Sequence, residues 1–294
     1  MRPLRALVIY LIFVFLGGAL IAPWLWHFMQ LFAHAFPRIA AAPFHRYLDR
    51  AFLILALIGI WPLMRALGAT SPQEVGIVPP YGQMKKLSGG IFLGIVSLAV
   101  VAGIEIAGGA RSFNQTVTAH QIVSAIFSAL LTAIVVGALE EILFRGAIFG
   151  GLRRVFGWPI ALGVSSLVFA LMHFLKRADI AGPVNWNSGF ILLAKLFDFH
   201  AFVPEFFGLT LVGALLAFAY QRTGNLYFSI GLHGGWVFIL KIFGALTVQS
   251  ASSANSFWGT GKMVDGWLAF LILIATLIVF KFLPLEKRPP YTIR

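Results

Sequence analysis

Apolar runs of about twenty residues recur along this chain and limit its fold more than any other feature. A helix of about twenty apolar residues crosses the hydrocarbon core of a bilayer, whereas a barrel strand needs only about ten. Hydrophobic residues make up 60% of the 294 residues and charged residues only 11%, against about 25% charged in soluble domains. Because lipid offers the backbone no hydrogen-bond partner, such runs must be helical. We therefore expect an all-α, polytopic membrane protein.

The runs predict about eight transmembrane helices in a single membrane domain, residues 1–294. The first run exceeds the 7–15 apolar residues of a signal peptide, so we expect an uncleaved span. Polar and aromatic residues alternate in 27–46 and 178–203, which predicts interfacial or partly re-entrant connections. The predicted spans are 7–26, 47–67, 88–107, 121–150, 158–176, 205–221, 226–246 and 264–283.

The charges indicate a lipid-facing rather than a nucleic-acid-binding protein. The net charge of +12 fits Lys and Arg in loops beside anionic lipid, and we see no basic soluble domain. The absence of cysteine excludes thiolate catalysis and thiolate metal sites. If the N-terminus is inside, Lys and Arg are more frequent in the inside segments, leaving out Arg145 and Lys241, which we expect to be buried. This predicts a cell (inner) membrane protein with both termini in the cytoplasm.

Two adjacent carboxylates, Glu140 and Glu141, lie within the fourth predicted span. Ionisable side chains in the hydrocarbon are costly and usually mark function. Glu141 and Arg145 are i and i+4 on one helix face, so we expect them to pair. Glu140 points about 100° away around the helix and therefore needs another polar neighbour.

Two histidines on other predicted spans can be that neighbour, His173 on the fifth and His233 on the seventh. Counted from the predicted inner boundary at about 1.5 Å per residue, Glu140 and His173 both lie roughly 20 Å deep. His233, counted from Asn225, is expected nearer the cytoplasm, at roughly 12 Å. Glycines at 231, 234 and 235 allow close helix approach around His233.

A carboxylate beside an imidazole can take a proton from water and deliver it to a leaving amine. A second imidazole can stabilise the oxyanion of a tetrahedral intermediate. Glu140, His173 and His233 could instead hold a divalent metal such as zinc, so the cofactor question stays open at this point. No His-Glu-x-x-His or Glu-x-x-His motif is present.

The motifs together resemble the CAAX-protease and bacteriocin-processing family of intramembrane proteases, also called the CPBP or abortive-infection family. The resemblance rests on Glu-Glu-x-x-x-Arg at 140–145, Phe-x-x-x-His at 169–173 and His233 after a Gly-rich approach, and it covers 120–245 as a catalytic core. It implies an eight-helix fold and hydrolysis of membrane-associated, CAAX-like or leader peptides. Family members are often labelled metalloproteases, and a glutamate mechanism without metal competes with that view.

Carried over residue by residue, the resemblance implies Glu140 as general base, His173 as its partner on the water and His233 as oxyanion stabiliser. Glu141 and Arg145 would support the site. The chain departs from the family at Val237, where members often have Asn or Asp four residues after the third-motif histidine.

Two other function classes remain. The first is a non-catalytic member of the same fold that binds a membrane partner, which Val237 keeps open. The second is a proton-coupled transporter in which Glu140 and His173 carry protons, although no paired repeats support it. In the protease reading the partners are membrane lipid and a peptide or protein substrate.

Overall fold

A computed structural model describes residues 2–68, 71–174, 180, 182–195, 203–259 and 261–284. These residues are mostly helical, as the sequence predicts. They form two compact units, one of residues 1–70 with 168–201 and the other of residues 71–167 with 202–294. The boundary at 167/168 falls within helix α7 (Trp158–Phe174).

The prediction of an all-α, polytopic membrane fold is confirmed. Two shorter apolar helices, at 158–173 and 267–282, match the remaining predicted spans, and their crossing of the bilayer stays a prediction. Among the described residues, six helices are long and apolar enough to cross a membrane: Leu4–Leu31, Phe44–Ala66, Met84–Ala107, Ala119–Phe156, Val203–Thr223 and Tyr227–Leu246.

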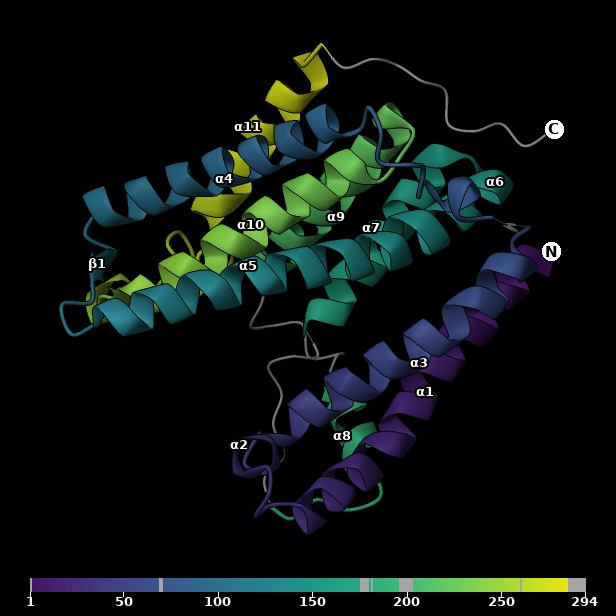
Figure 1. Cartoon of the computed structure of the whole chain (residues 1–294), viewed down its shortest axis with the longest axis horizontal. Coiled ribbons are helices and arrows are strands. Elements are labelled where there is room, and N and C mark those ends of the chain that lie inside the picture. Colours follow the sequence, from purple (N-terminus) through teal and green to yellow (C-terminus); the bar gives the residue numbers. More distant parts are fainter. Residues whose placement is uncertain are drawn as a thin grey trace. The chain divides into compact units, whose positions relative to one another are not determined.

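The first unit contains the helix pair α1 (Arg2–Leu31) and α3 (Phe44–Ala66), which lie side by side in Figure 1. Close packing is possible because Gly59 leaves room for the ring of Tyr10. The Tyr10 hydroxyl donates a hydrogen bond to the carbonyl of Ala56 at 3.1 Å. This buried bond gives the phenol a partner inside an apolar contact.

Short helices connect the elements of this unit. Helix α2 (Pro37–Ala40) lies within the predicted interfacial stretch between α1 and α3. Helix α8 (Ser188–Ala194) packs on α1, where Gly189 lies against the backbone of Ala19. The prediction of a re-entrant connection at 178–203 falls partly outside the described residues and stays a prediction.

The second unit carries the Glu-Glu pair and His233. Its helix α5 (Ala119–Glu141) begins with a capping box, in which Thr118 and Gln121 exchange side-chain and backbone hydrogen bonds. Its elements are η1 (Pro72–Val75), α4 (Met84–Ala107), β1 (Arg111–Phe113), α5 (Ala119–Glu141), η2 (Ile142–Phe149), α6 (Gly150–Phe156), the first part of α7, α9 (Val203–Thr223), α10 (Tyr227–Leu246), β2 (Thr247–Gln249), η6 (Ala251–Ser253) and α11 (Trp267–Phe282).

Helix α10 lies between α4 and α5 (Figure 1). Its Gly231 and Gly235 lie against the backbone of α4, and Gly90 and Gly94 of α4 lie against the backbone of α10. Such small-residue pairs let two membrane helices approach closely. On the other side, Gly234 of α10 meets Gly137 of α5, where an added Cβ on Gly137 would lie 3.2 Å from the Gly234 nitrogen. These contacts bring the His233 segment against the Glu-Glu segment.

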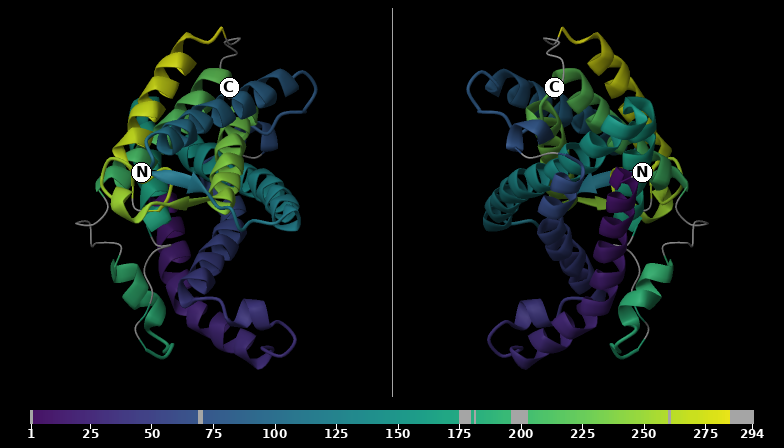
Figure 2. Two further views of the ribbon diagram at one scale, coloured as in Figure 1. Left: turned by 90° about the vertical axis from the view of Figure 1, so that its left-hand side faces the viewer. Right: turned by 90° about the vertical axis from the view of Figure 1, so that its right-hand side faces the viewer.

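A two-stranded antiparallel ribbon, β1 with β2, lies at one end of this unit, and Figure 2 shows the two arrows together. Ser112 pairs with Val248 at its centre. The sequence prediction missed these strands, because three residues are too few to show an alternating pattern.

Candidate active site

Glu141 and Arg145 form a buried ion pair where the α5 helix changes geometry. The Glu141 Oε1 atom lies 2.9 Å from Arg145 Nη1, and the two side chains are 0% and 2% exposed. This is the i,i+4 pair expected from the sequence. The chain continues from α5 as the π-helical segment η2, which no pattern in the sequence predicts. π-Helical segments are rare in proteins, and those that occur often lie at functional sites.

Arg145 also ties this segment to helix α9. Its Nη2 atom donates to the carbonyl of Gly213 at 3.3 Å. Its guanidinium carbon lies 5.7 Å from the ring centroid of Phe144. A buried guanidinium is stable only where hydrogen bonds and an opposite charge compensate its lost hydration. Glu141 and the Gly213 carbonyl supply that compensation.

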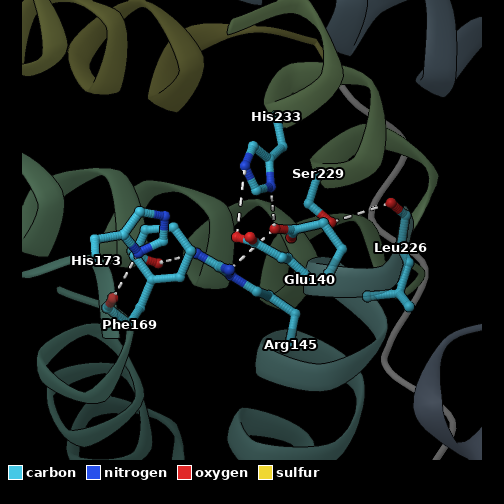
Figure 3. Close-up of polar contacts among 9 residues, drawn as sticks. Glu140, Arg145, Phe169, His173, Leu226, Ser229 and His233 are labelled. Carbon is cyan, nitrogen blue, oxygen red and sulfur yellow. Dashed lines mark hydrogen bonds and ion pairs between the residues drawn. The ribbon is translucent and has the colours of Figure 1, made fainter. Parts of the chain in front are cut away.

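His233 lies against both carboxylates, and Figure 3 shows it beside Glu140. Its Nδ1 atom is 3.0 Å from Glu141 Oε1, and its Nε2 atom is 3.9 Å from Glu140 Oε2. A carboxylate only accepts hydrogen bonds when ionised, so Nδ1 carries a proton when it bonds to Glu141. The ring is thereby oriented with Nε2 towards Glu140.

The two carboxylates differ in access. The Glu140 side chain is 19% exposed and the Glu141 side chain is fully buried. Glu141 is engaged by Arg145 and His233 through the same oxygen, Oε1. Glu140 is therefore the more exposed of the two carboxylates, although its Oε2 atom, which faces His233, is buried, and Glu141 is the one that holds its neighbours in place.

His233 and Glu140 lie at one level of the helix bundle, whereas the residue count from the sequence gave them different depths. His233 contacts Glu141 directly and so sits at the same level of the helix bundle. The count began at Asn225 as a membrane boundary, but Asn225 is buried and its Nδ2 donates to Gln83 Oε1 at 2.8 Å. A polar residue satisfied inside the protein does not mark the membrane surface.

His173 lies in the first unit, near the end of α7. Its Nδ1 atom is 2.9 Å from the carbonyl of Phe169, and the two rings are 4.3 Å apart between centroids. A carbonyl only accepts, so Nδ1 carries the proton in this hydrogen bond, and Nε2 is then the acceptor in the neutral ring. The predicted meeting of His173 with Glu140 joins two units and stays a prediction.

Among the described residues, no set of donor side chains supports the alternative of a metal site. No group of three or more His, Asp or Glu side chains comes together there in a way that could hold a metal ion. His233 Nδ1 and Glu141 already face each other, and the Arg145 cation lies beside them. The candidate ligands Glu140, His173 and His233 belong to two units, so a metal site formed by all three stays a prediction.

Lys241 differs from the sequence prediction, which placed it among the buried residues. It is exposed on α10 and donates to two hydroxyls of α5, Thr132 Oγ1 at 2.8 Å and Ser128 Oγ at 3.2 Å. Hydropathy alone could not reveal this contact, because it shows which residues are apolar and not which helix faces meet.

Comparison with known proteins gives one family match. Residues 122–239 match the model of the Rce1-like family, described as type II CAAX prenyl endopeptidase Rce1-like. The match includes Glu140, Glu141, Arg145, His173 and His233, and it confirms the resemblance recognised from the motifs. No curated protein and no solved structure matches the chain.

Proposed function

We propose that this chain, whose residues 122–239 match the type II CAAX prenyl endopeptidases of the Rce1-like kind, hydrolyses peptide bonds of membrane-associated substrates. The observation that carries the proposal is the placement of His233, whose two ring nitrogens face Glu141 and Glu140. A purely structural ion pair needs Glu141 and Arg145 alone. Beside this ion pair lie two further groups, His233 and the part-exposed Glu140. In the proposal they act together in proton transfer.

In this proposal Glu140 is the general base. It takes a proton from a water molecule whose oxygen attacks the substrate carbonyl carbon. The tetrahedral intermediate collapses with breakage of the carbon–nitrogen bond, and Glu140 returns the proton to the leaving amine. His233 donates from Nε2 to the developing oxyanion. Its positive charge in that form is balanced by Glu141, which lies 3.0 Å from the opposite nitrogen.

His173 is proposed to hold the attacking water. Its hydrogen bond to the Phe169 carbonyl supports this role, because a neutral ring protonated at Nδ1 has Nε2 as its acceptor nitrogen. The role requires His173 and Glu140 to face one substrate position.

Val237 lies one turn after His233 on α10 and is partly buried. A valine side chain cannot donate a hydrogen bond, so His233 is the proposed side-chain donor for the oxyanion from this helix. The proposed chemistry therefore proceeds without the amide that the family often has at this position.

The substrates proposed are peptides anchored in the membrane, including CAAX-like tails and leader-bearing peptides, which reach the site from lipid or from the cytoplasmic side. We also propose that the protein lies in the cell membrane with both termini in the cytoplasm, on the distribution of Lys and Arg.

The test is a cleavage assay with purified protein in lipid bilayers and a panel of prenylated and leader-type peptides. In water enriched in ¹⁸O, the wild type is expected to give two fragments, with the label in the new carboxyl group. Glu140→Gln is expected to give none while keeping the wild-type unfolding temperature. Glu74→Gln is the matched control, since Glu74 lies in η1 and not in the contact between Glu140 and His233. Equal cleavage by Glu140→Gln and wild type would refute the proposal.

A further inference from the structure

Helix α10 carries a buried indole that bonds to α4, one turn beyond His233. The Trp236 side chain is 3% exposed, and its Nε1 atom donates to Ser97 Oγ at 2.9 Å. The Ser97 hydroxyl in turn donates to the carbonyl of Gly94 at 3.0 Å. Because its proton is used there, the hydroxyl meets the indole as an acceptor. The two bonds link the α10 side chain to the backbone of α4.

Glycines make the backbones of α4 and α10 approach each other closely. A glycine has no side chain that interlocks with the facing helix, so such contacts set the distance between two helices better than the rotation of either one. A hydrogen bond adds a direction, because it weakens steeply as its angle closes. The bond of Trp236 to Ser97 therefore resists rotation of α10 about its own axis. The glycines in the contact are Gly231 and Gly235 on α10 and Gly90 and Gly94 on α4.

The rotation of α10 decides where the His233 ring lies. A side chain reaches about 5–6 Å from the axis of its helix, so a rotation of about 10° moves its tip by about 1 Å. The Nδ1 atom of His233 lies 3.0 Å from Glu141 Oε1, and the Nε2 atom lies 3.9 Å from Glu140 Oε2. A displacement of about 1 Å away from Glu141 would end that hydrogen bond.

We propose that the hydrogen bond between Trp236 and Ser97 positions His233 for catalysis, by holding α10 at the rotation that brings the ring to both carboxylates. This inference rests on the proposed peptidase function and adds two positioning residues to it. Neither residue touches the reacting atoms, and both act through His233. Their loss is expected to lower kcat more than substrate affinity, since a misplacement of about 1 Å can cost about 100-fold in rate.

Two substitutions remove the bond with little change of shape. Trp236→Phe keeps an aromatic ring without the Nε1 donor, and Ser97→Ala removes the acceptor. Each is expected to lower kcat on a cleaved membrane peptide by about 10- to 100-fold, while peptide binding stays within about threefold of wild type. The double variant is expected to lose no more than the worse single variant, because both changes remove one bond. Ser97→Thr keeps a hydroxyl and is expected to restore most of the activity.

The matched control is Tyr10→Phe, which also removes one hydrogen bond between two buried helix faces. The Tyr10 hydroxyl on α1 donates to the Ala56 carbonyl on α3, in the other unit. This variant is expected to lose stability without losing kcat per folded molecule. A wild-type kcat in folded Trp236→Phe, or equal falls of kcat in Trp236→Phe and Tyr10→Phe, would overturn the inference.

The ring nitrogens of His233 report its position without any cleavage. In protein with ¹⁵N-labelled histidine rings, the His233 signals are those that disappear in His233→Asn. Trp236→Phe is expected to shift the Nδ1 signal, because the bond to Glu141 changes, and Tyr10→Phe is expected to leave it in place. A merely structural role for Trp236 predicts no shift in folded protein.

This signal also separates the inference from the proposed function. A shift in Trp236→Phe, with no cleavage of any peptide by the wild type, would support the positioning of His233 and refute the peptidase. Cleavage by the wild type, with unchanged His233 signals in folded Trp236→Phe, would overturn the positioning contact and leave the peptidase standing.

Discussion

Removal of Arg145 tests the electrostatic account of the site most sharply. The Arg145→Met change keeps a long apolar side chain but leaves the carboxylate of Glu141, which is 0% exposed, without its guanidinium partner at 2.9 Å. Breaking a buried pair at one partner typically costs about 3–5 kcal/mol, because a charge remains buried and uncompensated. His233 lies 3.0 Å from the same oxygen and can supply a positive charge. We therefore expect the lower end, about 3 kcal/mol.

The double variant Glu141→Gln/Arg145→Met removes both charges. It is expected to lose only about 1 kcal/mol, the worth of an ordinary hydrogen bond. The measurement is reversible unfolding in mixed detergent–SDS micelles. It gives the free energy of unfolding of Arg145→Met, of Glu141→Gln and of the double variant. Arg65→Met is the matched control, because Arg65 is exposed on α3 and should change stability by less than about 0.5 kcal/mol.

Two results would refute this reasoning. One is an Arg145→Met protein as stable as the wild type, which would mean that Glu141 is not held by the guanidinium. The other is a double variant as unstable as Arg145→Met, which would mean that lost packing and the lost Gly213 contact, and not the stranded charge, cause the destabilisation.

Two further changes test the surroundings of His233. Val237→Asn adds an amide one turn from His233 and is expected to raise kcat/KM about tenfold through a second oxyanion donor; an unchanged or lower value in the cleavage assay would show that His233 needs no such help. Gly235→Val is expected to lower the free energy of unfolding by about 1–3 kcal/mol, because even a Cβ there would lie 2.7 Å from the Ile91 carbonyl. Gly103→Val on α4 is its control, with no atom within 4 Å of the added Cβ, and equal losses in both variants would contradict the close-packing account.

Hydropathy predicted most of the helical architecture. The predicted spans 226–246 and 88–107 correspond to Tyr227–Leu246 and Met84–Ala107 in the structure. The fourth span was predicted as 121–150 and is a continuous apolar helix from Ala119 to Phe156. Boundaries shift because helices continue past the hydrocarbon wherever the protein itself satisfies their polar groups. The π-helical turn at 142–149 has no signature in the sequence pattern.

The sequence predicted the part of the site whose residues lie close together on one helix. Glu141 and Arg145 are four residues apart on one helix, so their pairing follows from helix geometry. The neighbour of Glu140 lies on a different helix, and the sequence left His173 and His233 as alternatives for it. The glycine contacts of α10 with α4 and α5 bring His233 to Glu140, and such contacts depend on which helix faces pack together.

The most direct test of the central claim is the ratio of kcat/KM between wild type and Glu140→Gln on one cleaved membrane peptide. We expect a fall of at least about 100-fold, the lower range for a lost general base. Peptide binding is expected to stay within about threefold of the wild-type value, since Glu140 acts on water and not on substrate affinity. Equal kcat/KM values for two folded, peptide-binding proteins would contradict Glu140 as the base.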